Sequence, residues 1–249
     1  MPTYSEIASA LTSALNLKQS PVAVSLVDAV PDGVPAWTGP APAGCRFWQE
    51  AASRTFATSA RHHDLCAVGM YTHNLEPTDA TNADLGTALN VFADLGYLRP
   101  EDVPQVPVLT SRPRFVVYGP LGETALPPDV VLLFVDAGQT LVLSEAAQQI
   151  EGGTTPALGR PACAVVPQAV NSNRAALSLG CCGARAYLDV MTPDVALFAV
   201  PGARLAAFAE RVSALARANA VLTTFHTIRR RDVEAGKTPT VAESLAAMA

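Results

Sequence analysis

The spacing of apolar residues near the N-terminus is helical. Ile7, Leu11 and Leu15 recur four positions apart, and Leu17 follows two positions later, which predicts an amphipathic helix beginning near Ser5. The apolar run PVAVSLVDAV at 21–30 follows, and its boundaries, a proline and the turn residues PDG, predict a strand. Residues 31–44 are rich in proline and glycine and predict a loop that leads directly to a cysteine.

The rest of the chain mixes helical and extended patterns. We predict helices over 46–60 and 82–98, separated by a helical or irregular stretch that ends near residue 75, and one long helix or a helix pair from 202 onward. Strands are predicted at 113–121, 129–137, 175–180 and 194–201. The segment at 138–153 is predicted to start extended and end as a helix. The N-terminal and C-terminal parts of the chain are thus predicted to be mainly helical, and the central part to contain both strands and helices. This order predicts one α+β domain over 1–249, with a mixed or antiparallel sheet flanked by helices and with long C-terminal helices.

Composition narrows the functional classes. Apolar residues make up 49% of the chain and charged residues 16%, and the net charge is −5, so a substantial core is expected. The one short basic run, IRRR at 228–231, gives no support for nucleic-acid binding. No apolar run has the length of a membrane helix, and the N-terminus lacks the pattern of a secretion signal. We therefore expect a cytoplasmic protein that binds neither nucleic acid nor membrane.

Five cysteines carry most of the chemical information: Cys45, Cys66, Cys163, Cys181 and Cys182. A reducing compartment disfavours disulfides and favours metal binding, catalysis or packing. Neither CxxC nor CxxH occurs, which excludes the local zinc-finger and ferredoxin spacings. A metal site would therefore have to be assembled by tertiary folding.

Three of these cysteines stand beside glycine or at the end of a predicted element, namely Cys45, Cys66 and Cys181. Glycine lets several backbone N–H groups approach a charged thiolate, as a metal or cluster site requires. The alternative is packing, because cysteine is often buried as a small apolar side chain. Cys163, between alanines, and Cys182 both fit packing.

Four short motifs resemble the DUF169 family of prokaryotic proteins: AGCRFWQEA, LCAVGMYTHNL, GRPACAVVP and SLGCCGAR. The resemblance covers roughly residues 5–215. In its last motif, Leu-Gly-Cys-x-Gly-x-Arg, the matching positions are Leu179, Gly180, Cys181, Gly183 and Arg185, which leaves Cys182 at the variable position. It supports Cys45, Cys66 and Cys181 as motif cysteines and Cys163 as a fourth candidate, and it implies no substrate.

Three thiolates suit a [4Fe–4S] cluster with one iron left open, and that iron can act as a Lewis acid. If Cys163 is also a ligand, the cluster is closed and its role is electron transfer, sensing or structure. Zinc is the alternative metal, since sulfur and histidine ligands also suit it. We expect Gly180, Gly183 and Arg46 to contribute to cofactor binding. Arg46, Arg160 and Arg185 each lie close to a motif cysteine. A guanidinium there either balances the cluster's charge, pairs with Glu50 or Asp64, or binds a substrate carboxylate.

Histidine and tyrosine are concentrated near Cys66. His62 and His63 precede it, and Tyr71 and His73 follow it. His62 and His63 fit either a solvated loop or a place near the metal. We predict His73, Tyr71 and Arg185 as catalytic residues, because His and Tyr exchange protons and a guanidinium binds carboxylates.

The sequence therefore predicts an iron–sulfur enzyme whose open iron carries out elimination, hydration or desulfuration on a small anionic or sulfur-containing molecule. A metal-binding structural or redox-sensing module with a closed iron–sulfur or zinc site is the main alternative, and cysteines that only pack are the third. The C-terminal helices either pair between subunits of a homo-oligomer or complete the core of a monomer.

Overall fold

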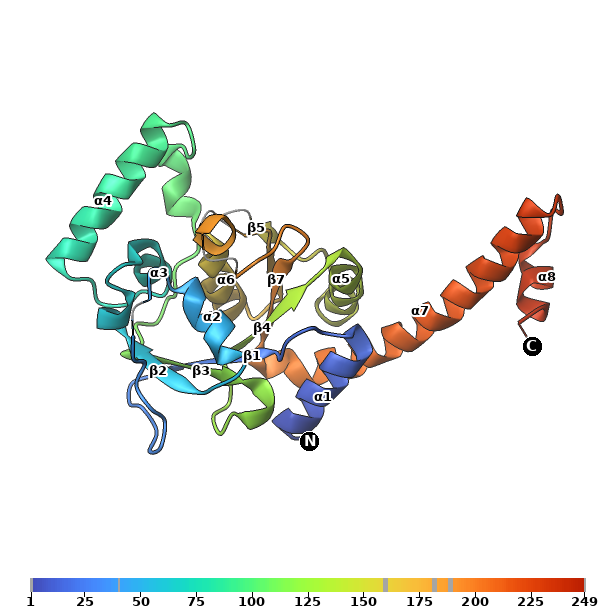
Figure 1. The fold of residues 1–249 in the computed structure, drawn as a ribbon, viewed down its shortest axis with the longest axis horizontal. Coiled ribbons are helices and arrows are strands. Elements are labelled where there is room, and N and C mark those ends of the chain that lie inside the picture. The colour runs from blue at the N-terminus through green and yellow to red at the C-terminus, as the bar shows by residue number, and fades with distance from the viewer. Residues whose placement is uncertain (1, 40, 159–160, 181–182, 188–189, 249) are drawn as a thin grey trace.

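The computed structural model describes residues 2–39, 41–158, 161–180, 183–187 and 190–248. Its centre is a seven-stranded sheet in the order β2-β3-β1-β4-β7-β6-β5, with helices on both faces (Figure 1). The strands are β1 (Val22–Val27), β2 (Phe56–Ser59), β3 (Phe115–Pro120), β4 (Val130–Val135), β5 (Ala157–Leu158), β6 (Ala176–Ser178) and β7 (Ala196–Pro201). The predicted α+β class and mixed sheet are confirmed.

Helices and short helical turns connect these strands. The α-helices are α1 (Tyr4–Leu15), α2 (Cys45–Ala51), α3 (Ala67–Thr72), α4 (Asp79–Asp94), α5 (Ala137–Glu151), α6 (Val165–Ser172), α7 (Leu205–Glu234) and α8 (Val241–Ala246). The shorter turns are η1 (Ala60–His63), η2 (Pro100–Gln105), η3 (Leu121–Glu123), η4 (Ala162–Ala164), η5 (Gly183–Tyr187) and η6 (Gly202–Arg204). The predicted long C-terminal helix is present as α7.

Most neighbouring strands run antiparallel, and β5 pairs with β6 in parallel. Strand β4 lies between β1 and β7 and has apolar side chains on both faces. Because successive side chains of a strand point to opposite faces, Val130 and Leu132 join one core and Val131 and Leu133 join the other. The apolar run that predicted this strand therefore serves two layers.

The two faces of the sheet carry different helices. Helices α1, α5 and the first part of α7 cover one core. Helix α2 packs on β1 and β3, and α6 packs on β4, β6 and β7, over the other core. This second layer also contains α3 and η4, and it holds the motif cysteines that the structure describes.

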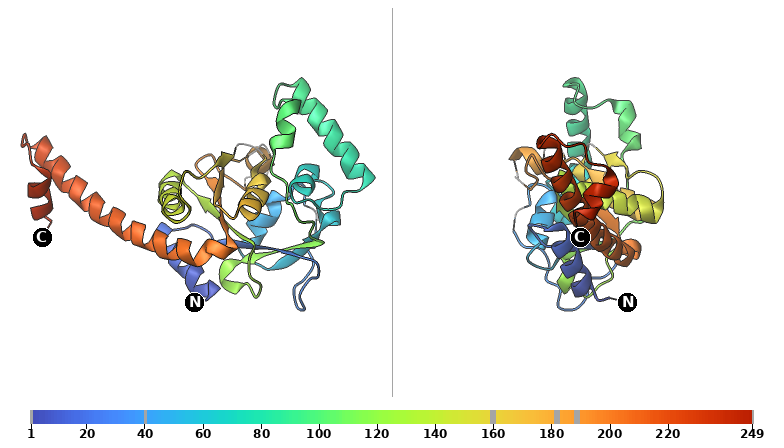
Figure 2. Two further views of the ribbon diagram at one scale, coloured as in Figure 1. Left: turned by 180° about the vertical axis from the view of Figure 1, so that it is seen from behind. Right: turned by 90° about the vertical axis from the view of Figure 1, so that its right-hand side faces the viewer.

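Two parts of the chain extend away from these layers. Helix α4 and the following stretch rise above α3, and the second half of α7 projects far from the sheet with α8 folded back against its end (Figures 1 and 2). No described helix is long and apolar enough to cross a membrane.

Two element predictions were wrong. The helix expected over 46–60 ends at Ala51, and Phe56–Ser59 forms edge strand β2 against β3. The segment expected to be extended from 138 is helical from Ala137, because Asp136 and Gln139 cap each other's backbone N–H groups, both at 2.8 Å.

Candidate functional site

A cavity of about 860 Å³ lies over the sheet between α2, α3 and η4 on one side and α4 and η2 on the other. Cys45, Cys66 and Cys163 all line it, and so does Tyr118 of β3. The structure therefore brings to one cavity three cysteines that are up to 118 positions apart in the sequence. Cys45 is buried, and the other two are half-buried.

Each of these cysteines sits where a helical element begins. Cys45 is the first residue of α2, Cys66 is the residue before α3, and Cys163 lies in η4. The Cys66 N–H donates to the carbonyl of His63 at 2.7 Å, and the carbonyl of Cys66 accepts from Met70 at 2.9 Å. The turn between η1 and α3 thus fixes the backbone of Cys66.

Two glycines make room for the Cys66 thiol. A Cβ atom on Gly69 would stand 2.8 Å from the Cys66 Sγ and 3.7 Å from Nδ1 of His63. A Cβ atom on Gly44 would stand 3.3 Å from the same Nδ1 and 3.7 Å from the same Sγ. Glycine at both positions therefore leaves space around one sulfur and one imidazole nitrogen.

His63 is buried and directs one ring nitrogen into this space. The Thr58 hydroxyl lies 3.4 Å from its Nε2 and 3.4 Å from the carbonyl oxygen of Val116. With the hydroxyl donating to the carbonyl, it accepts the Nε2–H, and Nδ1 keeps its lone pair. Nδ1 has no hydrogen-bond partner among the described residues. Of the two alternatives for His63, the solvated loop is excluded, because only 1% of its surface is exposed.

His73 presents a second lone pair. Its Nδ1 donates to the carbonyl oxygen of Gly69 at 3.0 Å, which leaves Nε2 deprotonated. This Nε2 is buried and, like the His63 Nδ1, has no hydrogen-bond partner within the described part of the chain. Both histidines line the cavity, with ring centres 6.1 Å apart. Fixing one imidazole nitrogen by a backbone or side-chain oxygen is how proteins usually prepare the other as a ligand.

Burial keeps both imidazoles neutral. It lowers the pKa of His63 to about 3, to which the neighbouring His73 contributes, and the pKa of His73 to about 4. Near pH 7 each ring therefore offers a lone pair to a ligand or metal. Burial also raises the pKa of Tyr118 above its usual range, and the nearby Cys163 and Cys66 add to this effect.

Thr72 links α3 to the third cysteine. Its hydroxyl lies 3.2 Å from the Cys163 Sγ and 3.1 Å from the carbonyl oxygen of Gly69, and these two acceptors share its one proton. A hydroxyl donor stabilises a thiolate over a thiol. The contact therefore suits Cys163 as a ligand, although alanines flank this residue as the packing alternative requires. Tyr71, predicted as catalytic, also lines the cavity from α3.

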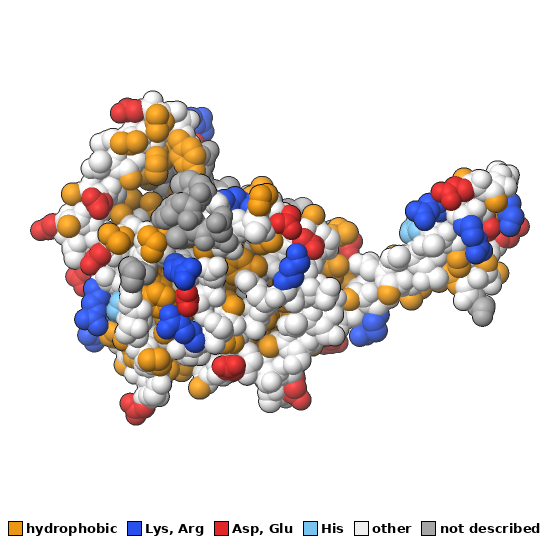
Figure 3. Space-filling view, viewed as in Figure 1, with side chains coloured by type: hydrophobic (Ala, Val, Ile, Leu, Met, Phe, Trp, Pro, Cys, Tyr) orange, Lys and Arg blue, Asp and Glu red, His pale blue; other side chains and the backbone are white. Residues whose placement is uncertain are grey.

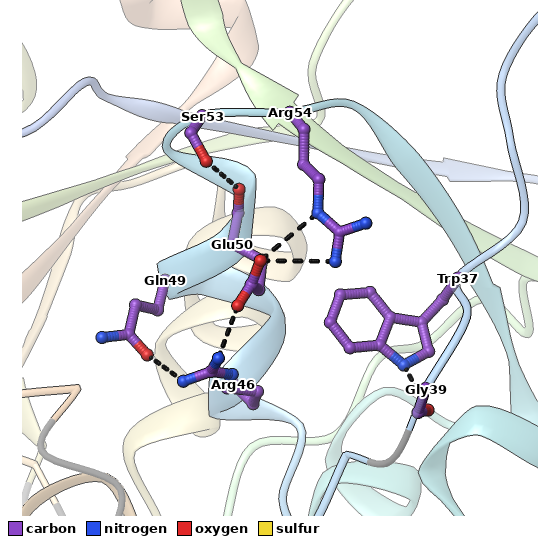
Figure 4. A network of polar contacts seen from close by, with 7 residues as sticks. All are labelled: Trp37, Gly39, Arg46, Gln49, Glu50, Ser53 and Arg54. Carbon is purple, nitrogen blue, oxygen red and sulfur yellow. Dashed lines mark hydrogen bonds and ion pairs between the residues drawn. The ribbon is translucent and has the colours of Figure 1, made fainter.

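Arg46 belongs to an ion-pair network on α2 (Figure 4). Its guanidinium contacts Glu50 at 2.6 Å and Gln49 at 2.7 Å, and Arg54 contacts the same Glu50 carboxylate at 3.3 Å. Of the alternatives for Arg46, the pairing with Glu50 is therefore observed. Its expected part in cofactor binding stays a prediction.

Arg185 is directed toward the backbone. Its guanidinium donates to the carbonyl oxygens of Leu179, Thr192 and Val195. Gly180 has φ +95°, and a Cβ atom there would stand 2.6 Å from Arg185 Nε, so this glycine accommodates the guanidinium. Gly183 lines the cavity. Arg185 thus holds together the loops on either side of η5, and its predicted catalytic role stays a prediction.

The described cysteines share one cavity wall, and the choice between a cluster and a single metal ion stays a prediction. Among the residues that the structure describes, no three His, Cys, Asp or Glu side chains gather closely enough to hold one metal ion. A zinc ion holds all its ligand atoms about 2.0–2.3 Å from one centre, whereas each cysteine of a [4Fe–4S] cluster binds a different iron, so its sulfurs stand farther apart. Cys181, the third expected ligand, and its neighbour Cys182 lie outside the described residues, as does Arg160.

The far wall of the cavity is formed by α4 and was not predicted from the sequence. Leu85, Ala88, Leu89 and Phe92 lie along one face of α4 and are half-buried there. Their spacing of three and four residues was a usable signal, since it marks a single helical face. It predicted the helix but not what the helix faces.

Comparisons with known proteins agree with the motif-based resemblance. No curated protein and no solved structure matches the chain. The model of one protein family, DUF169, described as "Uncharacterised ArCR", matches residues 10–211, most of the chain. The chain therefore belongs to the DUF169 family.

Proposed function

We propose that this protein is an iron–sulfur enzyme that holds a [4Fe–4S] cluster through Cys45, Cys66 and Cys181 and acts on a small molecule bound in the adjoining cavity. One observation carries the proposal: described thiols from three separate elements share a cavity wall with two buried imidazoles, each with an unpartnered nitrogen. Burying such groups without a partner costs free energy. A ligand or metal bound at this wall would supply the missing partner.

The chemistry follows from what each group offers. When bound, the cluster supplies a Lewis-acidic iron suited to non-redox lyase, hydratase or desulfurase reactions. His63 and His73, neutral and fixed by oxygen partners, accept hydrogen bonds from a substrate hydroxyl or amine. The Tyr71 hydroxyl, on the same wall, supplies a donor. The surroundings are largely apolar, so a substrate bound there displaces water, which strengthens these polar contacts.

A closed cluster is the second candidate, and Cys163 favours it. This cysteine lines the same wall as Cys45 and Cys66 and accepts a hydrogen bond from Thr72. Four thiolates would leave no iron open, and the cluster would then serve electron transfer, sensing or structure.

Anaerobic purification followed by iron and sulfide analysis tests the proposal. We expect a brown protein with broad absorbance near ~400 nm and about four irons per chain. Serine at position 45, 66 or 181 should abolish most of the iron, while Cys182→Ser, the matched control at the variable position, should retain it. A colourless protein that stays iron-free after anaerobic reconstitution with iron and sulfide would refute the proposal. A metal analysis that finds one zinc per chain would show that the site binds zinc, the alternative metal, instead of a cluster.

Cys163→Ser separates the two candidates. If Cys163 is not a ligand, the variant keeps four irons. The wild-type cluster, reduced with dithionite to its paramagnetic state, then changes its electron paramagnetic resonance spectrum when a small ligand such as cyanide is added. Loss of iron in Cys163→Ser, together with a wild-type spectrum that ignores added ligand, would establish the closed cluster.

A further inference from the structure

Helix α4 turns an apolar face toward the cavity, and few other elements pack on that helix. Its main contact with the rest of the molecule is α3. Leu85, Leu89 and Phe92 stay half-buried because they border the hollow and not a packed core. In the space-filling view, hydrophobic side chains gather over this part of the molecule (Figure 3). The cavity therefore has a polar wall of thiols and imidazoles opposite an apolar wall.

Charge is scarce around this cavity. Among the described residues that line it, the charged side chains are Asp84, Arg99 and Asp102. Arg99 donates two hydrogen bonds to Asp102, at 2.8 and 2.7 Å, so that pair neutralises itself. Asp84 is exposed to solvent. The described walls thus provide no uncompensated cation for an anionic ligand.

The cavity has the size of a small-molecule site. Sites for drug-sized ligands measure roughly 300–1,000 Å³ and are mostly apolar with a few polar groups, and this one measures about 860 Å³. Such a volume leaves room for an extended aromatic or aliphatic body along α4, with a polar or sulfur-bearing end near the histidines.

We propose that the substrate of this site is an uncharged molecule with a large aromatic or aliphatic body held by the α4 face, and not the small anion expected from the sequence. The substrate class deepens the proposed function and rests on it, because any reaction of the bound molecule requires the proposed cluster. Binding itself depends on the apolar wall, so it is measurable with or without the cluster.

Two fluorescent probes with the same aromatic body test this proposal on the full-length protein. N-phenyl-1-naphthylamine is uncharged, and 1-anilinonaphthalene-8-sulfonate adds one sulfonate. We expect saturable binding of the uncharged probe and binding of the sulfonate at least about tenfold weaker, because desolvating an unpaired anion is costly. Equal or tighter binding of the sulfonate would overturn the proposal, and it would point to a cation outside the described residues, such as Arg160.

A matched pair of leucines on one segment shows where the probe binds. Leu89→Gln, at the cavity, should lower the affinity for the uncharged probe about tenfold. This loss is similar to the free energy of burying one leucine side chain. Leu95→Gln is the control, since Leu95 is 75% exposed and does not line the cavity. Ala88→Gln serves as a second variant on the same face and should also weaken binding, with circular dichroism checking that both variants fold. Equal effects at 89 and 95, or no saturable binding to wild type, would refute the assignment.

Iron content separates this inference from the proposed function. An iron-free protein whose probe binding depends on Leu89 would refute the cluster and keep the apolar site. An iron-loaded protein that binds no uncharged probe would keep the cluster and refute the substrate class.

Discussion

Individual side chains at the cavity wall are held in place by neighbouring oxygen atoms. Thr58 holds one nitrogen of His63, the Gly69 carbonyl holds one nitrogen of His73, and Thr72 contacts the sulfur of Cys163. The contacts at His63 and His73 restrict each ring and leave its other nitrogen for a metal or substrate, while the Thr72 contact restricts the thiol itself. A site in which the reactive groups are already oriented loses little entropy on binding.

Gly69 allows a sharp test at this scale. Gly69→Ala places a Cβ atom 2.8 Å from the Cys66 Sγ, so the sulfur must move away from its present position. We expect the iron content per chain to fall at least about twofold, as is typical when a neighbour of a metal ligand is altered, while circular dichroism shows a folded protein. Metal analysis after anaerobic reconstitution measures this.

Gly86→Ala is the control for that substitution. Gly86 lies inside α4 with open space where a Cβ atom would be, so alanine should keep the iron content and stabilise the helix by up to ~1 kcal/mol. Unchanged iron in Gly69→Ala would mean that the space beside Cys66 is not needed for metal binding.

At the scale of elements, apolar runs predicted the central strands, and tertiary pairing decided the others. The runs at β1, β3, β4 and β7 are buried on both faces, so their composition identifies them. Strand β2 has four residues and follows a helical pattern. All four residues pair with β3, about sixty positions away, and Ala57 also forms a bridge with Ala36 on its other side. No local pattern encodes such a pairing.

The same limit applies to the site. The dispersed cysteine pattern predicted a site assembled by folding, and three of its cysteines do line one cavity. The sequence does not decide between the two alternatives for His63, because its place in the fold depends on Thr58 of β2, a strand that the local sequence pattern does not indicate. The apolar wall was missed because helical spacing shows that α4 has a face but not that the face borders a hollow.

Two phenylalanines on α7 should differ strongly in their effect on stability. Phe208 is fully buried in the core beneath the sheet, whereas Phe225 belongs to neither core cluster and lies in the projecting part of the helix. We expect Phe208→Ala to lower the free energy of unfolding by about 3–5 kcal/mol. Phe225→Ala should change it by less than ~1 kcal/mol, because the projecting part can open locally without unfolding the sheet. Urea denaturation of both variants checks this, and equal losses would contradict it.

The whole molecule consists of a layered body and a long helical arm. Helix α7 has 30 residues and is about 45 Å long at the standard rise. Its buried positions in the body end at Val212, and the family match ends at residue 211. The body therefore coincides with the family, while the arm carries exposed apolar residues such as Val221, Leu222 and Val233. Whether the arm joins subunits, as one of the two sequence-based alternatives holds, stays a prediction.

Removing the arm tests this division. A chain ending at Ala218 keeps every residue of both cores and every residue that lines the cavity. We expect its melting temperature to fall by less than about 4 °C, the shift that corresponds to roughly 1 kcal/mol for a chain of this size, and its iron content and probe binding to match those of the full chain. Light scattering on both chains reports whether the arm also sets the oligomeric state. A truncated chain that aggregates or loses its cooperative melting transition would show that the body depends on the arm, because the truncation removes no residue that lines the cavity.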